Sequence, residues 1–267
     1  MKMPKIFAVL LLGLCCCPLP AQDARNAVRQ VVNNELAADK ADRSRWMYYE
    51  VDVKPNKSVK QWVAQTSHGN VNRVVERNGH PIPKPQQRKN VGSFIHNSNE
   101  RAQLRQNDQK DATQAEQLLR MLPDAFLWSF KSKTTDTITY HFKPDPSFNP
   151  PSRQARVFAA MEGDMTVNTD QLRIQHLKGT MIHDVNFGWG ILGSLKKGGW
   201  FEVNRIRTAP DIWQINVTHV HIQGRALLFK TISEQEDDTL AAFSRLPDDI
   251  TLEQAAEEVM KQPNKPE

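Results

Sequence analysis

The sequence predicts an α+β fold that is mostly β, built on a large antiparallel meander that must cover one apolar face or curl around it. Two observations predict it. Beyond residue 125 the chain consists of short alternating segments that follow one another directly, which favours antiparallel strands over βαβ units. Helical periodicity is confined to an N-terminal segment, a long insert at 86–121 and a short C-terminal segment. We therefore expect one domain over residues 22–267, with the N-terminal helix and the insert against one face of the sheet.

The first 21 residues have the order of a secretory signal peptide. Two lysines precede an apolar run from Ile6 to Cys17, and Pro18-Leu-Pro-Ala21 leads into a polar segment. The run is shorter than the roughly 20 apolar residues that span a bilayer. We expect cleavage after Ala21 and export to the periplasm. All three cysteines lie in this segment, so the exported chain would have no disulfide. The alternative is a lipid anchor on Cys15, although lipoprotein processing prefers a smaller residue than Leu14 before the cysteine.

The first half of the chain predicts a helix, three strands and a helical insert. Near-helical apolar spacing indicates a helix over Asp23–Asp39. Alternating or β-rich segments then predict strands at 45–53, 59–65 and 70–77, and Asn78-Gly79 is a strong turn signal. The insert at 86–121 is polar and proline-free, which is typical of one or two amphipathic helices. We expect a mobile polar stretch within it, near Asn97 to Asp111.

The second half predicts a series of strands. Phe126, Trp128 and Phe130 share one face of the first, and Ile138, Tyr140 and Phe142 share one face of the next. Further strands are expected at 155–168, 170–183, 198–207, 213–222 and 225–233. The acidic run Glu234–Asp238 indicates a solvated turn. A short helix over Thr251–Lys261 and a frayed tail at 262–267 complete the chain.

The charge of the chain gives little support to nucleic-acid binding. Two of the 35 lysines and arginines lie in the signal segment, which leaves 33 against 30 acidic residues and a net charge of +3. The basic residues are scattered and form no stripe with stacking aromatics. We therefore expect no nucleic-acid partner and only transient or peripheral contact with membranes.

His219-Val-His221 is the sharpest local motif. Residues two apart on a strand point to one face, so the two imidazoles could hold a metal ion. His141 or the pair His183-Asp184 could supply a third ligand if their strands are neighbours. The more ordinary interpretation is that these polar residues face water, and we expect no bound metal or other cofactor.

Two further patterns give weak indications of chemistry. Glu162 and Asp164 flank Gly163 and would share a strand face, as paired carboxylates in glycosidases do, but a solvent-facing position is the simpler interpretation. The segment Gly188-Trp-Gly-Ile-Leu-Gly193 has the spacing of a phosphate-binding loop, but no βαβ unit surrounds it. We therefore predict a non-catalytic protein.

The order of elements resembles the LolA/LolB-like group of periplasmic lipoprotein carriers. The most specific stretch runs from Phe142 to Ile174, where Gly163, Met165, Val167 and Asn168, together with Leu172 and Ile174, match the pattern of a strand pair in that fold. The resemblance implies that the meander curls into an incomplete, half-open β-barrel with a helical lid formed by the insert at 86–121. It also implies a hydrophobic cavity and transient binding of acyl chains. No particular ligand-contacting residue of those carriers aligns with this chain, and its insert is longer and more polar.

From these features we expect a periplasmic carrier or sensor that binds the acyl chains of lipids or lipidated cargo. The residues expected to line its cavity are the large apolar side chains of the predicted strands: Trp46, Tyr48, Trp62, Phe126, Trp128, Phe130, Tyr140, Phe142, Met165 and Trp213. One alternative is a metal-dependent hydrolase built on His219 and His221. Another is an envelope module that binds a protein partner through an exposed sheet edge.

Overall fold

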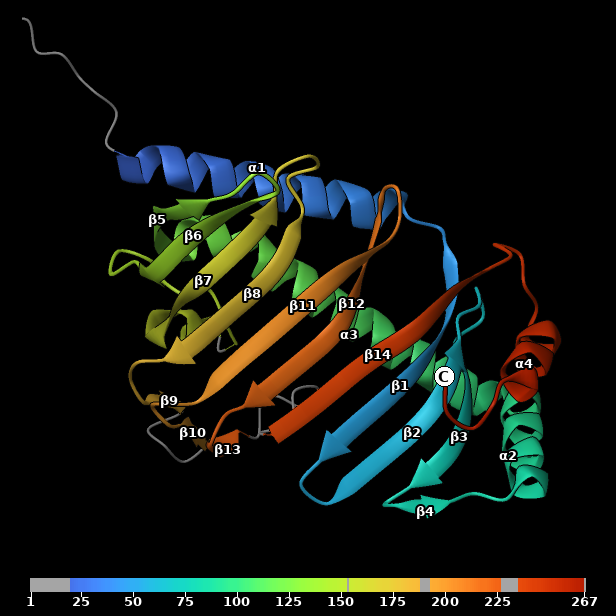
Figure 1. Ribbon diagram of the computed structural model, residues 1–267. Helices are drawn as coiled ribbons and strands as arrows, with labels where there is room; N and C mark the ends of the chain where they lie inside the picture. Colours follow the sequence, from blue (N-terminus) through green and yellow to red (C-terminus); the bar gives the residue numbers. More distant parts are fainter. Residues whose placement is uncertain (1–19, 153, 188–192, 227–234, 267) are drawn as a thin grey trace, which may run out of the picture.

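A computed structural model describes residues 20–152, 154–187, 193–226 and 235–266 (Figure 1). The helices are α1 (Pro20–Ala41), α2 (Lys84–His96), α3 (Ser98–Ala125) and α4 (Leu252–Lys261), with a 3-10 helix at Gln154–Ala160. The strands are β1 (Arg45–Lys54), β2 (Lys57–Ala64), β3 (Val71–Arg77), β4 (His80–Pro81), β5 (Phe126–Lys133), β6 (Thr137–Pro144), β7 (Met161–Asn168), β8 (Ile174–Met181), β9 (Val185–Phe187), β10 (Gly193–Leu195), β11 (Trp200–Ala209), β12 (Ile212–His221), β13 (Gly224–Ala226) and β14 (Gln235–Leu246).

One antiparallel sheet of 11 strands dominates the structure and confirms the α+β, mostly β fold class. Its order is β4-β3-β2-β1-β14-β12-β11-β8-β7-β6-β5, and its described strands do not close into a barrel. The order corrects the simple meander, because β14 inserts between β1 and β12 and joins the first four strands to the rest (Figure 1). A small second sheet contains β13, β10 and β9.

The prediction of a solvated turn at Glu234–Asp238 is wrong from Gln235 onward, because this segment begins β14. Its carboxylates alternate between the two faces of the sheet, so that each meets partners of its own. Asp238 lies opposite Asp52 on β1, while Asp237 lies opposite His219 on β12. Charge composition alone favoured a turn, and only the pairing with two neighbouring strands accommodates the run in a sheet.

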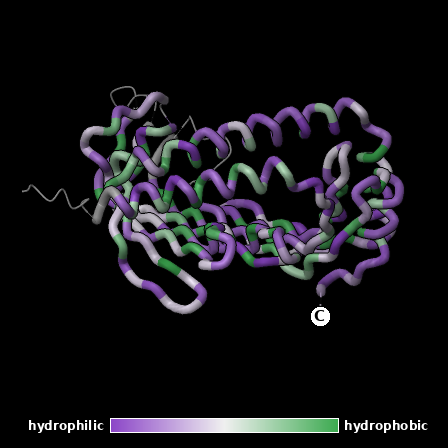
Figure 2. Tube along the Cα trace, turned by 90° about the horizontal axis from the view of Figure 1, so that it is seen from above, coloured by the Kyte–Doolittle hydropathy of each residue, from purple (hydrophilic) through white to green (hydrophobic). Residues whose placement is uncertain are grey.

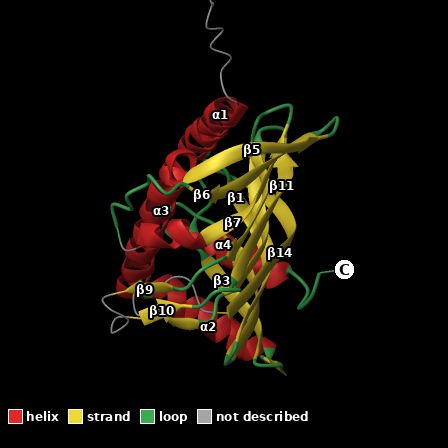
Figure 3. Ribbon diagram, turned by 90° about the vertical axis from the view of Figure 1, so that its left-hand side faces the viewer, coloured by secondary structure: helices red, strands yellow, loops and turns green. Residues whose placement is uncertain are grey.

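The two long helices α1 and α3 lie side by side on one side of the sheet, here called the inner face (Figure 3). Figure 2, which colours the Cα trace by hydropathy, shows that most residues of the long helices are hydrophilic. Val28, Val31 and Val32 of α1 and Leu122 of α3 are buried in a core with side chains of β5–β8. Because apolar area removed from water contributes roughly 25 cal/mol per Å², this end of the sheet holds both helices firmly.

Helix α4 packs on the opposite, outer face of β2 and β3. Its Ala255 and Val259 lie in a second core with Tyr49 and Trp62, whereas Tyr48, the neighbour of Tyr49, points to the inner face. Helix α4 begins with a capping box, in which Thr251 accepts from the Gln254 amide at 3.2 Å and the Gln254 side chain accepts in return. Helix α2 completes this second core with Val91.

Two further local predictions differ from the structure, and a third falls largely outside the described residues. Residues 97–111 were expected to include a mobile polar stretch, but Ser98–Ala125 is one continuous helix with Asn97 as its N-cap. Residues 155–160 belong to the 3-10 helix, so the strand predicted from 155 begins at Met161. The strand expected at 225–233 is described only for Gly224–Ala226, because residues 227–234 lie outside the described residues.

The tail predicted to fray is instead bound to the sheet. The buried Arg73 guanidinium donates to the carbonyls of Val259, Gln262 and Pro263, and to the Asn264 side chain at 3.0 Å. The Trp62 indole also donates to Pro263, at 2.7 Å. Arg73 therefore satisfies carbonyls at the end of α4 that the helix itself leaves without partners.

Most of the expected signal segment, including Cys15, lies outside the described residues, as do Trp189 and most of the glycine-rich loop at 188–193. Among the described residues, no helix combines the length and apolar character that crossing a bilayer would require.

Candidate functional site

The inner face of the sheet carries a row of side chains that changes in character from one end to the other. Residues directly opposite one another on neighbouring strands point to the same face, so the pairing register defines the row. From β5 to β2 it reads Phe130, Tyr140, Met165, Leu177, Val203, Thr218, Asp238, Asp52 and Val59. The first five are apolar or aromatic, and the acidic pair lies on β14 and β1. The row is therefore amphiphilic across the sheet.

A pair of glycines shapes the apolar part of this face. Gly163 on β7 lies opposite Gly179 on β8, between Phe142 of β6 and Phe201 of β11. A Cβ on Gly163 would lie 2.0 Å from the Lys178 carbonyl oxygen and 2.7 Å from the Phe142 ring, and one on Gly179 would lie 2.5 Å from the Phe201 ring. Both rings therefore lie over bare backbone, which only glycine permits.

The acidic part of the inner face is a group of four carboxylates with one lysine. Glu50, Asp52, Glu236 and Asp238 belong to it, and Lys54 binds Asp52 at 3.0 Å and Glu236 at 2.8 Å. Burial, followed by the charges of its three carboxylate neighbours, raises the pKa of Asp238 to about 7. Burial likewise raises the pKa of Glu50, against a hydrogen bond from Gln61. This end of the face has an excess of negative charge even though Asp238 holds a proton part of the time.

Helix α3 crosses in front of this face without packing closely onto its centre. No side chain from Ser98 to Met121 is fully buried. Leu118, Leu119 and Met121 are partly buried against the core, and full burial begins at Leu122. Even Leu104 and Ala115, which lie on the stripe that includes Leu122 and faces the sheet, are exposed. The principal neighbours of α3 are α1, α2, β5 and the 3-10 helix, which lie toward its ends. The middle of α3 is thus a strap fixed at both ends.

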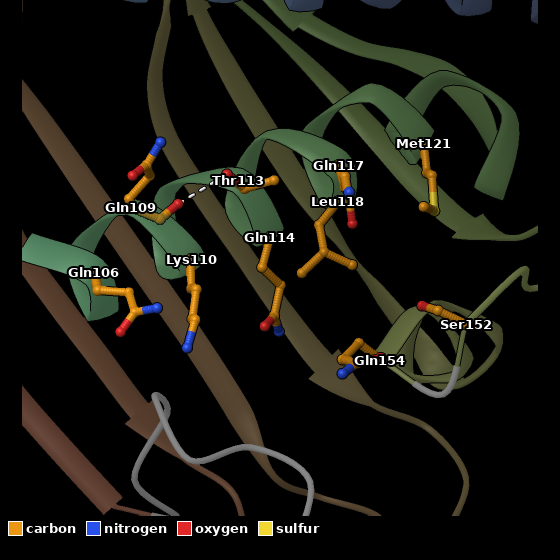
Figure 4. A pocket seen from close by; sticks show the side chains of 10 residues that line it. All are labelled: Gln106, Gln109, Lys110, Thr113, Gln114, Gln117, Leu118, Met121, Ser152 and Gln154. Carbon is orange, nitrogen blue, oxygen red and sulfur yellow. Dashed lines mark hydrogen bonds between the residues drawn. The ribbon is translucent and has the colours of Figure 1, made fainter. Parts of the chain in front are cut away.

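Three clefts of about 460, 490 and 320 Å³ lie along α3. Figure 4 shows the first, in which Gln106, Lys110 and Gln114 project from the helix while Leu118 and Met121 continue the same side toward Gln154. The second cleft lies between α3 and the β2–β3 loop, and the third between the N-terminal end of α3 and Asp52, Val59 and neighbouring residues of β1–β3. Only the third cleft is lined by inner-face side chains of the strands, Asp52 and Val59 among them, whereas the first is lined by α3 together with Ser152 and Gln154.

The structure places the ten predicted cavity residues in different surroundings. Five of them form one buried cluster beneath α1 and the end of α3: Phe126, Trp128, Tyr140, Phe142 and Met165. Their rings pack on one another, with centroids 4.7 Å apart for Phe126 and Phe142. None of the ten lines any of the three clefts. These five are therefore part of the hydrophobic core at the β5–β8 end of the sheet.

The other five predicted residues are dispersed. Trp46 and Tyr48 pack with Phe243 at the acidic end, and Trp213 is buried with its indole donating to Gln171 at 2.8 Å. Trp62 was predicted to line the same cavity as Trp46 and Tyr48. This prediction is wrong, because Trp62 lies on the outer face of the sheet beside α4. Phe130 was expected to line the cavity with Trp128 but is 61% exposed, whereas Phe126 and Trp128 of the same strand are buried.

The histidines lie on the outer face, away from the strap. His219 and His221 do share a face, as predicted, and the residue that joins them is Asp237 of β14. The proposed third ligands are elsewhere: His141 binds Glu162 and Asp164, and Asp184 binds Lys196. Glu162 and Asp164 are accordingly paired with His141, consistent with their expected solvent-side position. Asp237 was missed because nothing in the sequence reveals that β14 is the neighbour of β12.

Neither a protein-family model nor a curated protein matches this sequence.

Proposed function

We propose that this protein is a non-catalytic binding protein of the cell envelope that takes the acyl chain of a lipid or of lipidated cargo between α3 and the inner face of the sheet. The observation that carries the proposal is the strap: 24 residues of α3, from Ser98 to Met121, cross the face without one fully buried side chain, and the apolar ones that are partly buried lie at its C-terminal end, at Leu118, Leu119 and Met121. In a protein with no ligand to accommodate, a helix of this length would ordinarily bury an apolar stripe. A chain inserted beneath it would supply the missing contacts.

The amphiphilic row gives the ligand an orientation. The acyl chain would lie toward Leu177 and Val203, where each buried CH₂ contributes about 0.8 kcal/mol. The polar end would lie toward Asp52 and Asp238. Because like charges repel at short range, these carboxylates disfavour an anionic head group and favour a neutral or cationic one. The proposal therefore specifies a class of amphiphile as well as a place for it.

The proposed carrier or sensor role also accounts for the polar insert. The amide and lysine side chains along the first cleft, such as Gln106, Lys110 and Gln114, remain hydrated when no ligand is bound. Most side chains of the strap are polar, so its movement away from the sheet would expose only a few apolar residues, such as Leu118 and Met121. This behaviour suits transient loading and release, as in the carriers that the sequence resembles.

The test is a titration of the protein with a dansyl-labelled long-chain amine and with the matching carboxylic acid, followed by fluorescence. We expect the amine to bind more tightly. Leu177→Gln should weaken binding of both probes by roughly tenfold, since about 1.4 kcal/mol of apolar contact is lost. Asp52→Asn should reduce the preference for the amine while leaving the protein folded, because Asp52 is partly exposed.

The matched control is Lys178→Gln, which changes the next residue of β8 on the opposite face. It should bind both probes as the unmodified protein does, with a similar unfolding temperature. Equal binding by Leu177→Gln and Lys178→Gln would contradict the proposed site. If neither probe binds the unmodified protein or any variant, and another envelope protein binds saturably instead, the result would favour the alternative of a protein-interaction module.

A further inference from the structure

The outer face of the sheet carries its own register-matched row, made almost entirely of charged and imidazole side chains. From β5 to β14 it contains Ser129, His141, Asp164, Lys178, Glu202, His219 and Asp237. Over most of this row each carboxylate meets a lysine. Lys131 binds Asp164 at 2.7 Å, and Lys178 binds Glu202 at 3.0 Å. These pairs neutralise one another on an exposed surface and need no ligand.

The row changes where β12 meets β14. Asp237 lies directly opposite His219, and its ion-pair partners in the structure are two imidazoles. Its Oδ1 atom lies 2.5 Å from His219 Nδ1 and 2.8 Å from His221 Nε2. Among the described residues, His219, His221 and Asp237 form a group of possible metal ligands. Each offers one ligand atom, and these three atoms lie within 4.8 Å of one another.

We propose that His219, His221 and Asp237 form a binding site for a divalent transition-metal ion such as Zn²⁺. Imidazole nitrogen and carboxylate oxygen are ligands that zinc prefers, and three protein ligands leave a position for water. Zinc lies 2.0–2.2 Å from such ligands, so the ligand atoms around it are about 3.3 Å apart. Opening the present contacts by less than about 1 Å would admit the ion in place of the shared hydrogen bonds.

The surroundings fix the ligands and leave the site accessible. Trp200 of β11 lies opposite His221 and stacks on its ring, with centroids 4.6 Å apart and planes 3° from parallel. The side chains of His219, His221 and Asp237 are 32%, 35% and 40% exposed, so an ion can enter and water can complete its coordination. Because both histidines lie on one rigid strand, their spacing is fixed by the pleat rather than by a loop.

The experiment is a calorimetric titration of the full-length, chelator-treated protein with Zn²⁺, repeated with Co²⁺ while visible absorption is recorded. We expect one site whose affinity falls by more than roughly tenfold in His219→Gln, in His221→Gln and in Asp237→Asn, since loss of even an outer partner of a metal ligand costs that much. The matched control is His176→Gln, which removes an equally exposed histidine that binds Glu202 on the same face.

A second measurement leaves the ligands intact. Bound Cu²⁺ should quench the indole stacked on His221, so Trp200→Phe should lose the quenched part of the fluorescence and still bind the ion. Unchanged zinc affinity in the three ligand variants, or the same loss in His176→Gln, would overturn the proposal. Quenching by Cu²⁺ that persists in Trp200→Phe would also place the ion elsewhere. None of these outcomes depends on acyl-chain binding at the inner face.

Discussion

Glu35 is the residue whose environment most constrains the position of α1. Its carboxylate is 2% exposed, binds Arg173 at 2.8 Å, and also accepts from Arg205 and from the Ile174 amide. Removing one partner of a buried ion group leaves the others uncompensated, at a cost of about 3–5 kcal/mol. We predict that Glu35→Gln lowers the free energy of unfolding by about that amount in urea denaturation. Glu116→Gln, in an exposed pair with Arg120, should cost less than about 0.5 kcal/mol.

The pH dependence of stability offers a second readout of Glu35. Burial opposes ionisation, but the hydrogen bonds and charges of Arg173 and Arg205 outweigh it and lower the pKa of Glu35 from 4.5. A lowered pKa contributes stability above the unfolded value and loses it as the pH falls through the folded value. The unmodified protein should therefore lose stability below about pH 4.5 more steeply than Glu35→Gln does. Parallel curves for the two proteins would contradict this assignment.

At the scale of single residues, the sequence predicts which side chains share a face of one strand better than it predicts which strands lie side by side. Alternation correctly placed Trp128 with Phe126, and His219 with His221, because both pairs depend only on the period of one strand. It could not place Trp62 or Asp237, since those positions depend on which strand lies beside which. Phe130 follows the alternation and is nevertheless exposed, although Phe126 and Trp128 of the same strand are buried, so the period of a strand does not predict how far along it the core extends.

Among the elements, the C-terminal helix is held by an interaction that a sequence pattern does not reveal. Arg73→Met keeps the apolar stem and removes the guanidinium that binds the carbonyls after α4. We predict a loss of about 2–4 kcal/mol in the free energy of unfolding, because charged hydrogen bonds to buried carbonyls are lost. Amide exchange over Leu252–Lys261 should accelerate as well. Arg77→Met, an exposed arginine of the same strand, is the control and should leave that exchange unchanged.

The elements also show how far local patterns extend. The helix over Asp23–Asp39, the strands of the first half and the capped helix near Thr251 were predictable, because caps, alternation and turn residues act within a few positions. The insertion of β14 between β1 and β12 was not, because its acidic start is stable only against these partners. The loose packing of the middle of α3 against the inner face was not predictable either, since a polar helix can be solvated on all sides or can cover a site.

At the scale of the whole molecule, the sheet separates two kinds of chemistry. Its inner face joins an apolar floor to an acidic end beneath a strap, and its outer face carries carboxylate–imidazole pairs. Helices α1 and α3 are held at the β5–β8 end by a shared core, so movement of the strap need not disturb the sheet. The proposed functions of the two faces are therefore separable by experiment.

The most direct test of the central claim is native mass spectrometry of the full-length protein purified without detergent. We predict a bound mass that organic extraction resolves into a neutral or cationic amphiphile with an acyl chain, and loss of that mass in Leu177→Gln but not in Lys178→Gln. A protein that carries no added mass, and takes up neither a lysolipid nor a long-chain amine when these are supplied, would contradict the claim.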